Sequence, residues 1–262
     1  MIGQNSLKKD FKDYTLDTIP KFILLIATRG QGKRTFAEYL AKQFNVSLVI
    51  LNSDIDSIRK FVEESYNNKF TIFYYIPEIE SLSVQAQSVL LKYTEEQPKN
   101  SVLIAGDSKY SFKLSPLRNR AKIFAFYRYM DEEKKEYLGD HEYAKEILDY
   151  SQNLYFIDLY KKQDMKKFMK FVNYFADNFG IMKGYEAFNL LDKMYNKDGS
   201  EEYNFELVIN TLFKLFCKKL ELLDYADCCS KYLYKFQQST NKKVTMDMWI
   251  LAMREIYFKK EG

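Results

Sequence analysis

Cysteine, histidine and tryptophan are scarce in this sequence. Its 262 residues include three cysteines, one histidine and one tryptophan. Cys217, Cys228 and Cys229 lie close together in a segment of helical pattern, and no C-x-x-C pair occurs. Neither a structural zinc site nor a disulfide scaffold is therefore expected. We expect a protein of the reducing cytoplasm that holds no metal ion.

Long apolar runs and a strong charge of one sign are also absent. No stretch reaches the roughly 18 apolar residues of a membrane-spanning helix, and the N-terminal sequence MIGQNSLKKDF has no apolar core of a signal peptide. The chain has 40 Lys and Arg against 36 Asp and Glu, a formal net charge of +4. This balance argues against a membrane partner. It also means that any contact with DNA has to come from a local patch.

In the first half of the chain, strand patterns alternate with helix patterns. Short apolar or β-branched runs predict strands, and apolar residues at helical spacing predict helices between them. The strands are expected at 22–26, 47–51, 70–76, 101–105 and 121–126, and the helices at 33–44, 55–66 and 82–96. This alternation indicates an α/β fold, a mostly parallel sheet covered by helices on both faces.

From about Tyr129 the strand patterns stop and only helices are expected. The predicted helices are 131–139, 141–162, 164–179, 181–196, 202–222, 224–239 and 245–258. An α/β domain followed by an all-helical half therefore has its boundary near residue 128. A second, weaker boundary is expected near residue 164.

A damaged phosphate-binding loop follows the first predicted strand. Such a loop reads G-x-x-x-x-G-K-[ST] between a strand and a helix, and its backbone amides and lysine hold phosphates. Here Ala27 replaces the first glycine, whereas Gly30 eases the turn and Gly32 and Lys33 match the motif. The context predicts a degenerate nucleotide site. The alternative is a glycine-rich turn that never binds nucleotide.

Both protein groups that hold magnesium in such ATPases are missing. Arg34 occupies the hydroxyl position, and Thr35 lies one residue later, a rotation of about 100° on a helix that should turn its hydroxyl away. The acidic pair expected after a neighbouring strand is Pro77-Glu78. Proline carries no carboxylate, and Glu78 alone could be an ordinary loop residue. We therefore expect no magnesium and no hydrolysis, although Lys33 and the loop amides could still hold ATP or ADP weakly.

Several stretches, in chain order, resemble the clamp-loader AAA+ ATPases of bacteria and phages, most of all the delta-prime subunits of the DNA polymerase III clamp loader. The most specific is QAQSVLLKYTEEQP at 85–98, which resembles the family's AQNALLKTLEEPP. Further similar segments are IGQ at 2–4, DSIR at 56–59, IPEIE at 76–80 and LSPLRNRA at 114–121. The resemblance covers about residues 1–127 in sequence and the remainder only in architecture.

This resemblance implies an AAA+ core over 1–128, a helical lid over 129–164 and a helical collar or oligomerisation domain over 165–262. The family inserts the arginine of its SRC motif into a neighbour's ATP site, and that arginine corresponds to Arg120 here, although Asn119 and Ala121 replace its flanking residues. The zinc-binding cysteines of bacterial subunits are missing. Phe156 stands where active members carry a sensing arginine in the lid.

Loss of the metal ligands with retention of Arg120 implies a non-hydrolysing subunit that supplies a trans arginine finger. The candidate nucleotide-loop residues are Gly30, Gly32, Lys33 and Thr35. The implied partners are clamp-loader ATPase subunits, a sliding clamp and, through the assembly, primed DNA, in a cytoplasmic hetero-oligomer for DNA replication. Two alternatives stay open: an active clamp-loader ATPase with an unusual metal site built on Glu78 and water, and an unrelated AAA+ adaptor. A cluster of lysines between 161 and 170 is best interpreted as a solvated helix face.

Overall fold

The computed structural model describes residues 1–108, 115–179, 181–182, 184–192, 203–239 and 241–261. The chain divides into two compact units. The first comprises residues 1–137 together with 153–155, and the second comprises 138–152 and 156–262. The expected three-part division into core, lid and collar stays a prediction.

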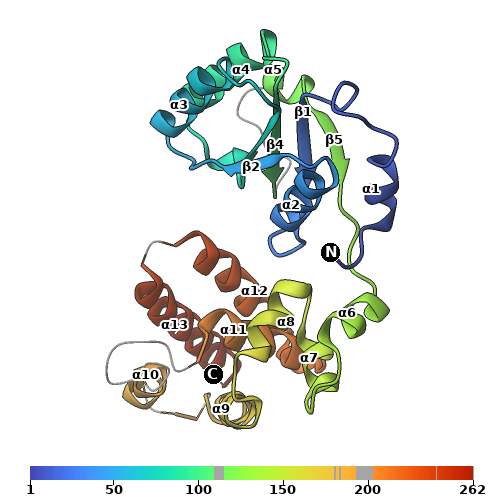
Figure 1. The fold of residues 1–262 in the computed structure, drawn as a ribbon. Coiled ribbons are helices and arrows are strands. Elements are labelled where there is room, and N and C mark those ends of the chain that lie inside the picture. The colour runs from blue at the N-terminus through green and yellow to red at the C-terminus, as the bar shows by residue number, and fades with distance from the viewer. Residues whose placement is uncertain (109–114, 180, 183, 193–202, 240, 262) are drawn as a thin grey trace. The chain divides into compact units, whose positions relative to one another are not determined.

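A five-stranded sheet forms the centre of the first unit (Figure 1). Its strands are β1 (Phe22–Ile26), β2 (Ser47–Ile50), β3 (Ile72–Ile76), β4 (Ser101–Asp107) and β5 (Lys122–Ala125). They lie in the order β2-β3-β4-β1-β5, and every neighbouring pair is parallel. The predicted parallel α/β sheet is therefore confirmed, and each strand run found in the sequence is one of its strands.

Helices cover both faces of this sheet, because residues along each strand point alternately to opposite sides. Leu24 of β1 packs with α3 (Ile55–Ser65) and α4 (Val84–Glu95) on one face. Its neighbours Ile23 and Leu25 pack with α1 (Asn5–Asp10) and α2 (Lys33–Gln43) on the other. Figure 1 shows these two helix pairs on opposite sides of the strands. The long buried strand β4 lies between β3 and β1, so the loops that follow β1 and β3 emerge at one edge of the sheet.

Local signals in the sequence fix the starts of two of these helices. The Asp54 carboxylate accepts a hydrogen bond from the Ser57 amide at the start of α3 (2.7 Å), and the Ser83 hydroxyl accepts one from the Ala86 amide at the start of α4 (3.1 Å). Such N-caps satisfy amides that have no partner within the helix. The remaining elements of this unit are the 3-10 turn η1 (Ile79–Ser81), α5 (Ser115–Asn119) and α6 (Asp131–Leu138).

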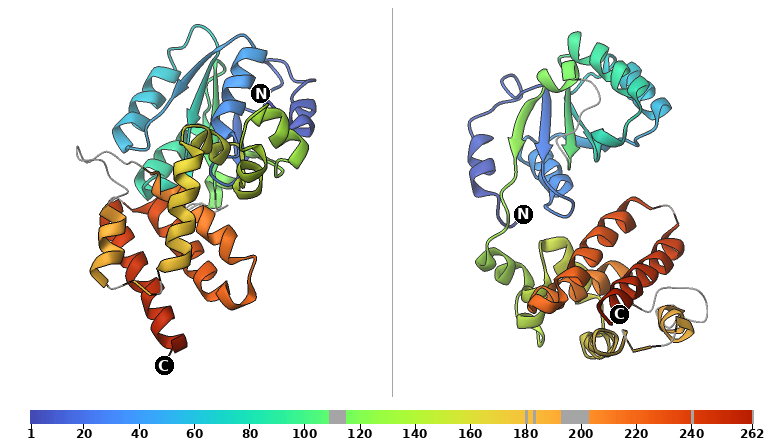
Figure 2. Two further views of the ribbon diagram at one scale, coloured as in Figure 1. Left: turned by 90° about the horizontal axis from the view of Figure 1, so that it is seen from below. Right: turned by 180° about the vertical axis from the view of Figure 1, so that it is seen from behind.

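The second unit is helical throughout its described residues. Its elements are α7 (Ala144–Tyr150), α8 (Leu154–Lys161), α9 (Met165–Asn178), α10 (Gly184–Asp192), α11 (Phe205–Phe216), η2 (Leu220–Leu222), α12 (Leu223–Gln238) and α13 (Lys242–Glu261). Trp249 of α13 is fully buried and contacts Phe175 of α9 and Phe205 of α11, with ring centroids 5.3 and 5.5 Å apart. These rings therefore join helices that are distant in sequence in one core. Figure 2 gives two further views of these helices.

The single helix predicted over 141–162 is wrong, because the chain breaks between α7 and α8. The amide nitrogen of Asn210 donates to the Tyr150 carbonyl (2.8 Å), and its amide oxygen accepts from the Gln152 side chain (2.7 Å). Asn210 is fully buried, so its side chain satisfies backbone at the end of α7 in place of a continuing helix. This break leads into residues 153–155, which belong to the first unit.

Several other boundaries also differ from expectation, among them the C-terminal helix, predicted over 245–258 and found as Lys242–Glu261. The strand predicted from residue 70 begins at Ile72, and Phe70 is 81% exposed. The helix predicted over 202–222 is α11 followed by the separate turn η2, and the part of the 181–196 prediction beyond residue 192 lies outside the described residues. Within the described residues, no helix has both the length and the apolar character needed to cross a membrane.

Candidate functional site

The loop between β1 and α2 adopts a conformation that requires glycine at two positions. Gly30 has φ 83° and Gly32 has φ 87°, both in the left-handed region that side chains disfavour. A Cβ atom on Gly30 would also come within 2.7 Å of Asn153 Oδ1 and of Tyr155 Cβ. These two glycines of the predicted phosphate loop therefore shape a tight turn, with residues 153 and 155 packed against it.

Lys33 begins α2 and folds back onto its own loop. Its ammonium group donates a hydrogen bond to the Ala27 carbonyl (2.6 Å) and lies 3.4 Å from the Thr28 carbonyl. The side chain is buried, and this desolvation lowers the pKa of Lys33, opposed by the negative charges of Glu80, Glu78 and Asp107. In this state the lysine satisfies backbone carbonyls of the loop.

The acidic residues that act on Lys33 come from the ends of two neighbouring strands. Glu78 and Glu80 follow β3, and Asp107 ends β4. Glu80 accepts hydrogen bonds from the backbone amide (2.9 Å) and the hydroxyl of Ser108. The sequence motif had singled out only Glu78, which is exposed here. Glu80 and Asp107 were missed, because their approach to the loop depends on the pairing of β4 with β1 and β3.

A third glycine, Gly106, lets these elements come together. A Cβ atom there would lie 2.3 Å from the Pro77 carbonyl oxygen and 3.1 Å from Lys33 Cε. The first distance is far below any real contact, so only glycine fits between these strand ends without a backbone shift. Its signal in the sequence is weak, since a lone glycine near a strand end has many explanations.

The residues present do not fit a magnesium ion held in the manner of an ATPase. Arg34, at the hydroxyl position, is exposed and its guanidinium pairs with Glu38 (3.0 Å). Thr35 is also exposed, and Pro77 stands where a carboxylate would be needed. Among the described residues, no group of three or more Asp, Glu, His or Cys is arranged to hold a metal ion. Gly30, Gly32 and Lys33 thus form the loop, while Thr35 lies on the exposed side of α2.

Two residues far away in the sequence cover the loop. The Tyr129 hydroxyl donates to the Gln31 carbonyl (3.1 Å), and Asn153 donates to the Arg29 carbonyl (3.0 Å). The Arg29 guanidinium lies 5.5 Å from the ring centre of Tyr155, within cation–π distance. Burial raises the pKa of Tyr129 to about 12, so it stays a hydrogen-bond donor at neutral pH. Side chains therefore occupy carbonyls on both sides of Gly30.

The N-terminal IGQ segment anchors the chain that carries Tyr129. The Gln4 side chain donates to the Tyr127 carbonyl (2.8 Å) and accepts from the Tyr127 amide (3.2 Å). Gln4 is fully buried and has φ 56°, which is unusual for a residue other than glycine. The amide thus pairs with both backbone groups of one residue, as a neighbouring strand would.

Arg120 lies apart from this loop, where α5 leads into β5. Its guanidinium pairs with the Glu95 carboxylate at the end of α4 (2.9 Å) and donates to the Pro116 carbonyl (3.2 Å). The side chains of Arg120 and Glu95 are 36% and 49% exposed, respectively. Arg120 is thus a surface residue held by one local carboxylate.

A parallel sheet in this strand order, with a phosphate-loop-like turn between β1 and α2, defines an AAA+ fold. A DNA polymerase III gamma subunit-related protein from Thermotoga maritima has a similar structure, with a TM-score of 0.57, 16% identity and coverage of 97% of this chain and 99% of that one. The RuvB Holliday junction branch migration motor from Thermotoga maritima has a TM-score of 0.54 and 18% identity, over 90% and 76% of the two chains.

Sequence comparison points in the same direction. The curated DNA polymerase III subunit gamma/tau of Mycoplasma genitalium is 26% identical over 171 residues, which cover 53% of this chain and 29% of the length of that relative. The profile of the Sigma-54 interaction domain family matches residues 5–115. The resemblance to clamp-loader AAA+ proteins predicted from the motifs is therefore confirmed, and so is the AAA+ fold class.

Proposed function

We propose that this chain is a non-hydrolysing subunit of a clamp-loader-type assembly in DNA replication, similar in role to a delta-prime subunit. The observation that carries the proposal is the state of the two metal positions. Arg34 is turned to solvent and paired with Glu38, and Pro77 offers no carboxylate. Phosphoryl transfer depends on a cation that neutralises the developing charge. Two defects that concern one ion favour loss of hydrolysis more strongly than either alone.

The contacts of the loop support the same proposal. Lys33 donates to its own loop carbonyl, and Asn153 and Tyr129 donate to the carbonyls of Arg29 and Gln31. A nucleotide would have to draw the Lys33 ammonium away from Ala27 before it could bind the terminal phosphates. We therefore propose weak binding of ATP or ADP at most, without magnesium.

The test is steady-state ATP hydrolysis by the purified chain, with and without magnesium. We expect turnover no higher than the buffer background. A matched Lys33→Ala variant, checked for folding by circular dichroism, shows whether residual turnover belongs to this loop. Magnesium-dependent turnover that Lys33→Ala abolishes would contradict the proposal and favour the alternative of an active ATPase.

One observation favours that alternative. The charges of Glu80, Glu78 and Asp107 all act on Lys33, so carboxylates are present near the loop even though none stands at position 77. In this reading Glu78 and bound water would replace the missing ligands. Because the alternative requires magnesium and hydrolysis together, the same assay separates it from the leading proposal.

We further propose that the chain acts within a hetero-oligomer in the cytoplasm, and that residues 165–262 form the main contact. Helix α13 supports this with two apolar stripes. Met246, Trp249, Ile250 and Met253 are buried within the unit. Val244, Met248, Leu251 and Phe258 are half or more exposed, at spacings of four, three and seven residues. An exposed stripe with this period matches the seam of a helix–helix interface.

The partners in this proposal are clamp-loader ATPase subunits, a sliding clamp and primed DNA. A relative named as a DNA polymerase III subunit and the fold shared with a gamma subunit-related protein support them. Co-purification of the chain with a clamp-loader ATPase is the expected result. An unrelated AAA+ adaptor would instead co-purify with other proteins, which distinguishes the third hypothesis.

Within the assembly, we propose that Arg120 reaches the ATP bound by a neighbouring subunit. Its present partner Glu95 is itself half exposed, and surface ion pairs contribute only about 0–1 kcal/mol. A guanidinium donates two parallel hydrogen bonds to a phosphate in the same way as it does to a carboxylate. Arg120 could therefore exchange Glu95 for a phosphate at little cost.

A further inference from the structure

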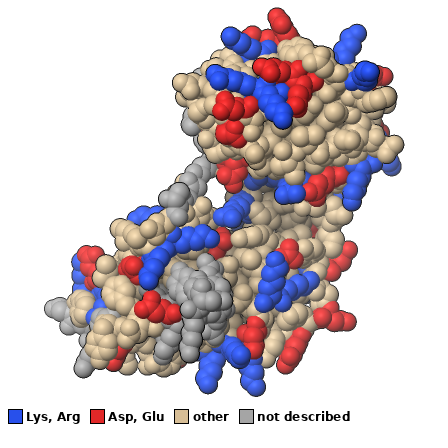
Figure 3. All heavy atoms as spheres, turned by 60° about the vertical axis from the view of Figure 1, so that its left-hand side comes forward, with Lys and Arg blue, Asp and Glu red and all other residues tan. Residues whose placement is uncertain are grey.

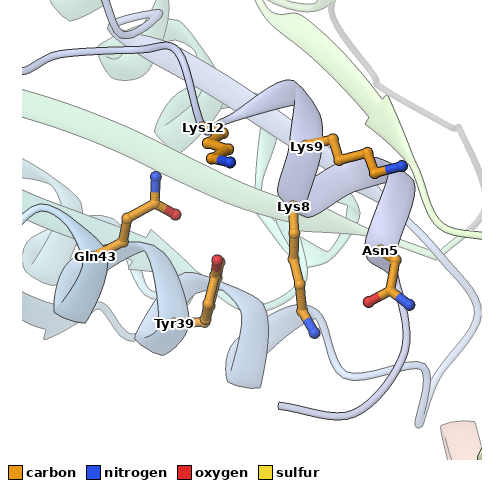
Figure 4. Close-up of a pocket in the computed structure, with 6 residues that line it drawn as sticks. All are labelled: Asn5, Lys8, Lys9, Lys12, Tyr39 and Gln43. Atoms are coloured by element: carbon orange, nitrogen blue, oxygen red, sulfur yellow. The ribbon is translucent and has the colours of Figure 1, made fainter.

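A basic hollow lies between α1 and α2, on the first unit and away from the residues of the phosphate loop. It has a volume of about 700 Å³ and is lined by Asn5, Lys8, Lys9, Lys12, Tyr39 and Gln43. Tyr39 and Gln43 project from α2 toward α1, and Lys8 and Lys12 enter from the α1 side, while Lys9 extends outward (Figure 4). None of these residues belongs to the phosphate loop or to the acidic segment after β3.

The sequence places this lining on one face. Asn5, Lys8 and Lys9 follow the spacing i, i+3, i+4 in α1, which gathers side chains on one side of a helix, and Lys12 follows in the turn after α1. Asp10 and Asp13 interrupt that spacing and are not among the lining residues. Tyr39 and Gln43 are four residues apart on α2, so they too share a face. The segment of α1 with its following turn, together with α2, therefore brings three lysines, two amides and one aromatic ring together.

The charge of the hollow is not balanced by its own walls. None of the six lining residues is acidic. Within the described part of the chain, Lys8, Lys9 and Lys12 form no ion pair, although ten other pairs are present there. Lys8 donates to the Met1 carbonyl (2.7 Å) and lies over the Tyr39 ring at 5.7 Å, both neutral partners. Elsewhere, as on the face in Figure 3, basic and acidic side chains are mixed.

We infer that this hollow binds the phosphate backbone of a nucleic acid. Lysine ammonium groups bind phosphates as point charges, and the Asn5 amide can donate to phosphate oxygens, whereas the Gln43 amide donates to the Phe11 carbonyl (3.0 Å). Because Asn5, Lys9, Lys12 and Gln43 are exposed, the site does not enclose a ligand as small-molecule pockets do. A strand lying across the surface fits such an open site better than a free nucleotide.

The inference deepens the proposed function, on which it rests for its biological setting, by giving the chain a direct contact with DNA. Its test uses the isolated chain and no assembly. If the chain turns out not to join a clamp-loader assembly, the DNA-binding measurement still stands. If the hollow does not bind DNA, the proposed place of the chain in an assembly is equally unaffected.

The experiment measures binding of a short fluorescent DNA duplex to the full chain by anisotropy, over a series of salt concentrations. The variant combines Lys8→Ala, Lys9→Ala and Lys12→Ala. The matched control combines Lys162→Ala, Lys166→Ala and Lys170→Ala. It removes the same charge from exposed lysines, two of them on α9 and one, Lys162, just after α8. Circular dichroism checks that both variants are folded.

We expect the hollow variant to raise Kd by at least about tenfold. The slope of log K against log salt should fall by about 2 to 3, since each lost phosphate contact removes about 0.9. The control should stay within about twofold of the wild type. Absence of binding by the wild type at low salt, an unchanged hollow variant, or an equal loss in the control would each overturn the inference. Tighter binding to phosphatidylserine vesicles than to DNA, lost in the hollow variant, would overturn it in favour of a membrane surface.

Discussion

Replacing Arg120 by alanine should separate a role in catalysis from a role in stability. In the free chain, the guanidinium of Arg120 makes one ion pair with Glu95 (2.9 Å) and one hydrogen bond to the Pro116 carbonyl (3.2 Å). Both side chains of the pair are more than a third exposed, and measured pairs of this kind contribute about 0.2–1 kcal/mol. We therefore expect Arg120→Ala to lower the free energy of unfolding by no more than about 1 kcal/mol.

In the assembly the expected effect is much larger. An arginine finger that reaches a neighbour's nucleotide contributes about 10³–10⁵ in rate. DNA-stimulated ATP hydrolysis by the reconstituted assembly should fall by a factor of this order with Arg120→Ala. Arg120→Lys should not restore it, because lysine keeps the charge but lacks the planar fork that matches phosphate oxygens.

Two controls make this prediction refutable. Arg118→Ala removes the nearest other arginine of the motif and should leave turnover close to wild type. Glu95→Gln breaks the same ion pair while Arg120 stays in place, so it should not reduce turnover. If Arg120→Ala leaves turnover unchanged in an intact assembly, or if Glu95→Gln reduces it as much, the arginine is a structural surface residue and the trans role is wrong.

Two further predictions concern stability and assembly. Gln4→Ala should destabilise the first unit by about 2–4 kcal/mol in urea unfolding, because it leaves the half-buried amide and carbonyl of Tyr127 without the Gln4 side chain as partner. The exposed neighbour Asn5→Ala should cost far less, and equal effects would disprove the anchoring role. Leu251→Asp, on the exposed stripe of α13, should keep the isolated fold but weaken assembly by about 30-fold or more, as loss of an interface anchor does. Leu220→Asp, at the exposed turn η2, is its control, and equal weakening by both would refute the stripe as the contact.

The strands of the sheet and most of the helices follow from short-range patterns. The apolar run at 22–26 corresponds residue for residue to β1, and the caps Asp54 and Ser83 precede helices whose spacing was already visible. These signals depend on neighbours within one turn or one strand, so a single sequence contains them. The break in the helix after Tyr150 has no such local signal. The Tyr150 carbonyl accepts a hydrogen bond from Asn210, which lies sixty residues later in the sequence.

The same distinction holds for the candidate site. The defects at Arg34 and Pro77 can be read directly from the motif, since they are differences of residue type at fixed positions. The covering contacts cannot, because Tyr129 and Asn153 reach the loop across 98 and 124 residues of sequence. Nothing near Asn153 in the sequence indicates a contact with Arg29. Only the fold brings them together.

The retained lysine is compatible with a chain that does not hydrolyse ATP. In an ATPase the loop lysine serves the terminal phosphates, and its presence would ordinarily suggest a working site. Here the buried Lys33 ammonium donates to the Ala27 carbonyl, and hydrogen bonds of charged groups contribute about 1.5–3 kcal/mol. Gly30 and Gly32 likewise have a conformational role in the turn.

The positions of the motif therefore fall into two groups: those that stabilise the conformation of the loop, which are retained, and those that would bind a metal ion, which are not. In this structure Gly30 and Gly32 shape the turn, and Lys33 satisfies the Ala27 carbonyl. The groups missing at positions 34 and 77 would act only on a metal ion. Arg34 pairs with Glu38 instead, whereas the close approach of position 77 to Gly106 uses a backbone carbonyl that any residue would supply. A loop can thus keep the sequence of a phosphate-binding motif for the sake of its own conformation. This is what we expect of a subunit that does not hydrolyse ATP.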